Sequence, residues 1–172
     1  MAKFDSNQVV SINPGNEFAY LNRGVVKYQQ GDPYSAIQDY EYALRIDPTY
    51  ELAFLKRGIA RLVLGNRQGA IDDYTKVIDF CTDNALAYII RAETYYELGY
   101  ESQAKKDFIK GYMLRGNQCY ASGNYAEAIE SYTHVLEVDP NNSEAYNRRS
   151  TARSAIGDYQ GAMEDLQRVR MI

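Results

Sequence analysis

The sequence is poor in the residues that most often carry metal or acid–base chemistry. Among its 172 residues it has two cysteines, Cys81 and Cys119, and one histidine, His134. The cysteines stand far apart without metal-type neighbours, and His134 has no obvious nucleophile or metal partner. We therefore expect no metal, no cofactor and no catalytic residues, and the few cysteines are typical of a reduced, cytoplasmic setting.

Long apolar runs and an excess of basic charge are missing as well. The longest hydrophobic stretches are short and interrupted, so we expect no membrane insertion. The formal net charge is −4 and the isoelectric point is near 5.1, so we expect no surface for nucleic acid. The stretch from Gly65 to Gly69 lacks the Gly-Lys-Ser/Thr ending of a phosphate loop, which disfavours a nucleotide site.

The sequence does contain one pattern that occurs five times. An arginine marks each copy at a constant interval, except that the fourth copy comes early, and a glycine and an alanine repeat the same intervals. The three series are Arg23, Arg57, Arg91, Arg115 and Arg149; Gly31, Gly65, Gly99, Gly123 and Gly157; and Ala36, Ala70, Ala104, Ala128 and Ala162. A period of about 34 residues is typical of helical repeat proteins, which hold other molecules rather than transform them.

Each copy is expected to form two helices joined at the repeated glycine. Apolar residues recur at helical spacing on both sides of the glycine, which can end the first helix in a left-handed cap. A short side chain that can cap the next helix follows the glycine in four copies, at Asp32, Asn66, Asn124 and Asp158, whereas the third copy has Tyr100. The pattern therefore predicts five helix-turn-helix units.

This pattern resembles the tetratricopeptide repeat family, in a bacterial-type multi-repeat form. The first aromatic position holds Tyr20, Phe54, Tyr88, Tyr112 and Tyr146; the small-residue position holds Gly24, Gly58, Ala92, Gly116 and Ser150; the second aromatic position holds Tyr40, Tyr74, Phe108, Tyr132 and Leu166. The match runs from about Glu17 to Ile172. The resemblance implies an all-α, right-handed α-solenoid without enzymatic activity.

The marker arginines stand where the family usually has leucine. Sixteen residues after each arginine come Asp39, Asp73, Asp107, Ser131 and Asp165, so four of the five copies offer a carboxylate. We expect an Arg–Asp pair that locks helix to helix within or between repeats. The alternative is a solvated arginine whose methylene stem merely packs.

The short interval between the third and fourth copies removes a turn. Neither proline nor asparagine occurs between Gln103 and Arg115, so we expect one helix over about 101–120 that both copies share. A break at Gly111 or Gly116 is the alternative. Downstream of such a fusion, the last two repeats are expected to form a second lobe or to exchange with another chain. The domain prediction is a partial repeat or arm at 1–16, repeats one to three at 17–108, and repeats four and five at 109–172.

In members of the family the first helices line a concave wall, and that resemblance names the binding residues expected here. They are Phe18, Leu21, Asn22, Val25, Tyr28, Leu52, Leu55, Lys56, Ile59, Leu62, Leu86, Ile89, Ile90 and Glu93. Because most of them are apolar, we expect a groove in repeats one to three that binds an apolar or amphipathic peptide segment. Replacing Leu55 and Ile89 with glutamate is expected to abolish binding without unfolding. The alternative is that these residues are interior, covered by the segment Val9–Ile12 or by another chain.

The expected partner is therefore a protein or peptide. Members that clamp acidic C-termini present several basic and amide side chains on this wall, whereas Leu21, Val25 and Lys56 offer one charge, so such a clamp is not expected. The alternative function is a self-assembling homo-oligomeric scaffold, such as a homodimer, that uses the fused helix and uncapped ends.

Overall fold

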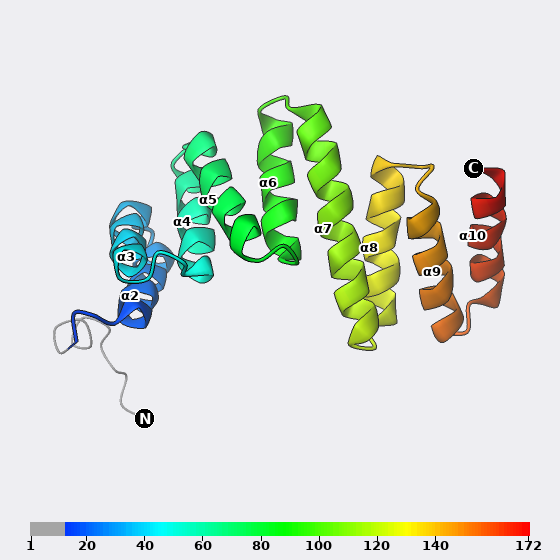
Figure 1. The fold of residues 1–172 in the computed structure, drawn as a ribbon, viewed down its shortest axis with the longest axis horizontal. Helices are drawn as coiled ribbons and strands as arrows, with labels where there is room; N and C mark the ends of the chain where they lie inside the picture. The colour runs from blue at the N-terminus through cyan, green and yellow to red at the C-terminus, as the bar shows by residue number, and fades with distance from the viewer. Residues whose placement is uncertain (1–12) are drawn as a thin grey trace. The chain divides into compact units, whose positions relative to one another are not determined.

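The computed structural model describes residues 13–172, which form helices and no strands (Figure 1). The helices are α2 (Glu17–Gln29), α3 (Pro33–Ile46), α4 (Glu51–Val63), α5 (Arg67–Phe80), α6 (Ala85–Glu97), α7 (Glu101–Ala121), α8 (Tyr125–Val138), α9 (Ser143–Ala155) and α10 (Tyr159–Met171). The predicted α-solenoid class of helix-turn-helix repeats, with a fused long helix, is confirmed. No helix of the described part is both long and apolar enough to cross a bilayer.

The chain divides into two compact units, Met1–Thr82 and Asp83–Ile172. The first contains α2 to α5, which are the first and second repeats. The second contains α6 to α10. The repeat pattern placed a division at 108/109 instead, and that point lies inside α7, which packs against both α6 and α8. The predicted N-terminal repeat at 1–16, including Val9–Ile12, falls largely outside the described residues.

The turns inside the repeats follow the predicted capping chemistry. Gly31 has a φ of 84°, which lets the Asp32 N–H reach back to the Lys27 carbonyl oxygen at 3.0 Å. The Asp32 side chain then caps α3 by accepting from the Ser35 N–H at 3.0 Å. Asn66 and Asp158 act in the same way, but Asn124, against expectation, makes no side-chain cap.

In the first, second and fourth repeats, the core contains a tyrosine from the second helix packed against a glycine of the first. A Cβ added to Gly24 would lie 2.6 Å from Tyr40 Cε1, so only glycine leaves room for the ring. The same contact recurs between Gly58 and Tyr74 and between Gly116 and Tyr132. Because the three tyrosines are almost wholly buried, these pairs fix how the two helices of a repeat pack.

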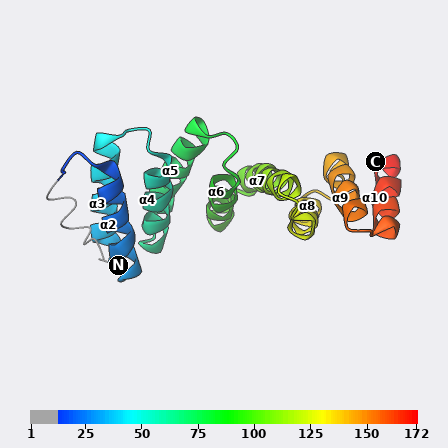
Figure 2. The ribbon, with the colours of Figure 1, turned by 90° about the horizontal axis from the view of Figure 1, so that it is seen from below.

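Helix α7 is continuous over 21 residues, as the missing turn predicted, and is about 30 Å long. Figures 1 and 2 show it between α6 and α8. Gly111 does not break it. This glycine is buried, and a Cβ there would lie 2.7 Å from Ile89 Cγ1 of α6. Gly111 therefore allows α6 and α7 to approach closely rather than ending a helix.

Candidate functional site

The predicted arginine–aspartate pairs are present in four repeats and join the two helices within each repeat. In the first, Arg23 donates from Nη2 to Asp39 Oδ1 at 2.6 Å and from Nε to Oδ2 at 2.9 Å. The same pairing joins Arg57 to Asp73, Arg91 to Asp107 and Arg149 to Asp165. All four carboxylates are buried, so each acid needs its cation. The alternative of a solvated arginine is wrong for these repeats.

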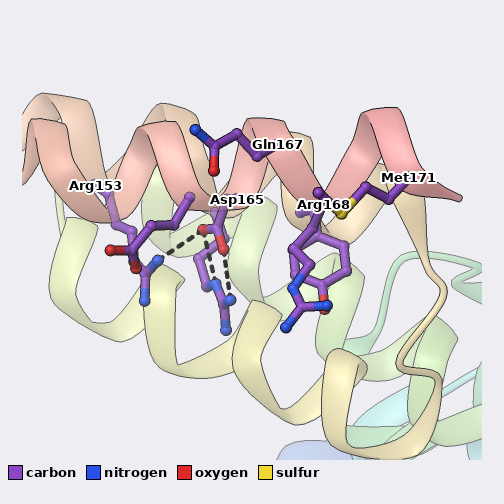
Figure 3. A pocket seen from close by; sticks show the side chains of 8 residues that line it. Arg153, Asp165, Gln167, Arg168 and Met171 are labelled. Atoms are coloured by element: carbon purple, nitrogen blue, oxygen red, sulfur yellow. Dashed lines mark hydrogen bonds and ion pairs between the residues drawn. The ribbon is translucent and has the colours of Figure 1, made fainter.

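A second cation, which the sequence analysis missed, completes three of these pairs. It lies one helical turn after the marker arginine: Lys27 reaches Asp39 at 2.8 Å, Arg61 reaches Asp73 at 2.9 Å and Arg153 reaches Asp165 at 3.0 Å. Figure 3 shows Arg153 directed at Asp165. The spacing of four residues between two basic side chains was the available signal.

The marker arginines also cover the aromatic residue three positions earlier. The guanidinium carbon lies 5.3 Å from the ring centre of Tyr20 in the first repeat, and the contact recurs over Phe54, Tyr88 and Tyr146. In the fourth repeat Tyr112 instead packs against His134, with ring centres 4.7 Å apart. These arginines therefore stabilise the packing of the repeats. The candidate binding residues are the others on the surfaces of the first helices.

The structure divides the predicted groove residues by exposure. Phe18, Asn22, Leu52, Leu86 and Glu93 are exposed, and Val25, Tyr28, Lys56, Ile59, Leu62 and Ile90 are half-buried. Leu21, Leu55 and Ile89 are only 4, 7 and 8% exposed and belong to the core instead. Their assignment to an accessible wall is corrected. Glutamate at Leu55 and Ile89 would bury two charges, so that pair of changes cannot test binding without threatening the fold.

Four of the predicted residues surround one cavity between α2 and α4. It has a volume of about 180 Å³ and is lined by Val25, Tyr28, Gln29, Tyr40, Lys56 and Ile59. The exposed Phe18 and Leu52 lie on the same two helices, at 58 and 42% exposure. Gln29 and Tyr40 were not predicted as site residues. The sequence analysis assigned Tyr40 to the repeat core only. The recurrence of an aromatic residue at this position was the available signal.

Burial dominates the electrostatics of this cavity. It raises the pKa of Tyr40 to about 12, with smaller contributions from Tyr28 and Asp39, so the hydroxyl stays protonated and can donate. On α6, in the second compact unit, burial and the neighbouring Glu97 raise the pKa of Glu93. That helix also carries the exposed Leu86.

A larger cavity of about 620 Å³ lies between α9 and α10 (Figure 3). It is lined by Tyr146, Arg149, Arg153, Glu164, Asp165, Gln167, Arg168 and Met171. None of the predicted groove residues is among them. Met163 and Leu166, on the same helix, are also exposed, so α10 presents an apolar surface beside a charged cavity.

Comparison with known families agrees with the repeat geometry. Residues 18–50 match the model described as tetratricopeptide repeat, and residues 116–150 match the model described as TPR repeat. The chain therefore contains tetratricopeptide repeats, as its sequence pattern predicted. Tetratricopeptide repeat proteins mediate protein–protein interactions.

Similar curated proteins match only part of the chain. A human small glutamine-rich tetratricopeptide repeat-containing protein beta is 37% identical over 67 residues, which cover 39% of this chain and 21% of the relative. Tetratricopeptide repeat protein 36 of Mus musculus is 35% identical over 72 residues, covering 42% of this chain and 39% of the relative. The matches thus span well under half of each relative.

Solved structures match the fold over most of the chain. MamA is 23% identical with a TM-score of 0.57, and the match covers 89% of both chains. YrrB, described as a TPR protein with an unusual peptide-binding site, is 18% identical with a TM-score of 0.54, covering 98% of this chain and 92% of its own. At these identities the likeness concerns the fold alone.

Proposed function

We propose that this chain is a non-enzymatic interaction module that binds an apolar or amphipathic peptide segment on its first helices. The observation that carries the proposal is the cavity between α2 and α4, with the exposed Phe18 and Leu52 on the same helices. The peptide-binding site described for YrrB, a structure of the same fold, supports it. In the second compact unit, Leu86, Ile90 and Glu93 on α6 are further candidate contacts.

The expected affinity follows from the apolar area available. Each leucine-sized anchor that becomes fully buried contributes about 1.5–3 kcal/mol. Four such anchors contribute at most about 12 kcal/mol, and an association cost of about 4 kcal/mol or more leaves at most about 8 kcal/mol, so we expect a Kd that is micromolar or weaker. A partner of this strength binds reversibly, as an adaptor requires.

The double variant Phe18→Glu with Leu52→Glu tests the proposal. Both side chains are exposed, so the variant is expected to keep its helical circular dichroism while it loses binding to peptides selected from a displayed library. The matched control is Tyr34→Glu with Tyr159→Glu, which adds the same charge at two residues that are each 70% exposed. Equal peptide binding by both variants and the wild type would contradict the proposal.

A second candidate function is a homo-oligomeric scaffold, and the surface of α10 is what favours it. In the second compact unit the corresponding face of α8 is covered by α9, and Arg149 Nη1 donates to Thr133 Oγ1 there at 3.0 Å. Gln167 is the counterpart of Thr133 on α10 and lies beside an open cavity. A second copy of the chain that covered this face would make the scaffold.

Light scattering over a range of protein concentrations separates the two functions. A scaffold is expected to gain mass with concentration and to lose that gain when Leu166 is changed to glutamate. A chain that stays monomeric at every concentration would exclude the scaffold and leave the peptide-binding proposal standing.

A further inference from the structure

Two polar groups in the cavity between α2 and α4 have no protein partner within residues 13–172. The Tyr40 side chain is only 1% exposed, yet its hydroxyl makes no hydrogen bond to any described residue. The Lys56 ammonium, on the other wall, makes no ion pair with any of them. The Tyr40 hydroxyl is accessible from the cavity, so a guest that supplies an acceptor would take the place of water there.

The fourth repeat shows what the Tyr40 hydroxyl lacks. Tyr132 occupies the same repeat position and donates its hydroxyl to Asn117 Oδ1 at 2.8 Å. The counterpart of Asn117 in the first repeat is Val25, which lines the cavity and cannot accept a hydrogen bond. The first repeat therefore has the donor and the space, but not the acceptor oxygen that the fourth repeat supplies internally.

The charge around the cavity selects between a neutral and an anionic acceptor. Four other cations on α2 and α4 form ion pairs with the second helix of their own repeat. Arg23 and Lys27 pair with Asp39, and Arg57 and Arg61 pair with Asp73. Lys56 is not one of these pairs, and no carboxylate of the described residues lines the cavity. An uncompensated ammonium beside a hydroxyl donor favours a carboxylate over an amide.

We propose that this cavity receives an apolar side chain of the bound segment, and that a glutamate or aspartate next to that side chain accepts from Tyr40 and Lys56. Val25 and Ile59 supply the apolar contact. The Tyr40 ring, held against Gly24, fixes the direction of the hydroxyl. The inference rests on the proposed function and adds to it the chemistry of the segment: an apolar residue with an acidic neighbour.

The experiment begins with a displayed library of random peptides selected against the full chain. From an enriched sequence, three synthetic peptides are made that carry glutamate, glutamine or leucine beside the apolar anchor, each with an amidated and with a free C-terminus. Fluorescence anisotropy then gives their Kd values. On the wild type, glutamate is expected to bind about tenfold tighter than glutamine, as for a charge-assisted hydrogen bond.

Three variants assign that preference to the named groups. Lys56→Met is expected to abolish the tenfold difference, and Tyr40→Phe to weaken the glutamate peptide about threefold. Val25→Asn copies the fourth repeat and gives Tyr40 an internal acceptor, so it is expected to weaken that peptide as well. The matched control is Lys76→Met, which removes the same charge from an exposed site on α5 and is expected to change nothing.

Each outcome decides between the two proposals. Equal binding of the glutamate and glutamine peptides would overturn this inference while leaving peptide binding intact. Acid-dependent binding that survives Lys56→Met would also overturn it, as would binding that requires a free C-terminal carboxylate instead of the side chain. If no selected peptide binds better than its scrambled sequence, the proposed function fails together with the inference.

Discussion

The arginine–aspartate pairs predict how much the free energy of unfolding falls when each arginine is replaced, and the repeats can be compared with one another. Three arginines occupy the same repeat position but have different partners. Within residues 13–172, Asp107 is paired with Arg91 alone, and Asp73 is paired with both Arg57 and Arg61. Arg115 has Ser131 at the acidic position and is exposed. Replacing each arginine with methionine keeps most of the apolar stem and removes only the charge and its hydrogen bonds.

The magnitudes follow from what each change leaves behind. Removing one partner of a buried pair costs about 3–5 kcal/mol, because the other charge stays buried and uncompensated. For Arg91→Met we expect about 3 kcal/mol, since Asp107 loses contacts at 2.6 and 2.9 Å and keeps no cation from the described part of the chain. For Arg57→Met we expect about 1–2 kcal/mol, because Arg61 remains 2.9 Å from Asp73. For Arg115→Met we expect a change within about 0.5 kcal/mol.

Urea unfolding followed by far-ultraviolet circular dichroism gives the free energies of unfolding. Amide hydrogen exchange then locates each loss, which should fall on α4 and α5 for Arg57→Met and on α6 and α7 for Arg91→Met. Equal costs for the three variants would refute the reasoning, because the cost would then come from lost packing of the stem. A negligible cost for Arg91→Met would show that the pair contributes nothing beyond its desolvation.

Three further changes have defined outcomes. Gly111→Ala should lower the free energy of unfolding by about 1 kcal/mol in urea titrations, because overpacking against α6 outweighs the helix propensity gained. Tyr132→Phe should cost about 1 kcal/mol through its lost hydrogen bond to Asn117, whereas Tyr40→Phe should cost nothing, as paired melting curves would show. Hydrogen bonds from the side chain and backbone of the serine three residues on lower the pKa of Asp32 from 3.8. The stability Asp32 contributes is therefore present above that ordinary pKa and is lost as pH falls through the lowered value, so Asp32→Asn should flatten the acid limb of a stability–pH profile.

The sequence alone was sufficient to predict the helix pairs, the fused helix and the ion pairs, because each depends on spacing along the chain. The segment from Arg23 to Asp39 includes the loop between the two helices of the repeat. The spacing places the two side chains opposite each other on the facing helices. The missing turn before Arg115 favoured a continuous helix over a break at Gly111 or Gly116, because neither proline nor asparagine occurs in that stretch. Periodicity therefore determined the contacts made inside a repeat.

Exposure could not be read in the same way. Leu21, Leu55 and Ile89 occupy the same position in successive repeats. The wrong prediction that they are exposed is therefore a single error that recurs in three repeats. An apolar residue at that position suits either a groove wall or a contact in the core, and the distance to the neighbouring helix decides between them. The hydroxyl of Tyr40 was missed for a similar reason, since the sequence shows that a tyrosine is present but not what its hydroxyl lacks.

In the first and fourth repeats, different polar contacts join the two helices of the repeat. In the first, Arg23 and Asp39 join the two helices, and the Tyr40 hydroxyl is left facing a cavity. In the fourth, Ser131 replaces the acid, and the hydroxyl of the tyrosine joins the helices through Asn117 instead. Because the ion pair already holds the first repeat together, its tyrosine hydroxyl is not needed for the fold. A guest can therefore use that hydroxyl without weakening the helix pair, and in the fourth repeat it could not.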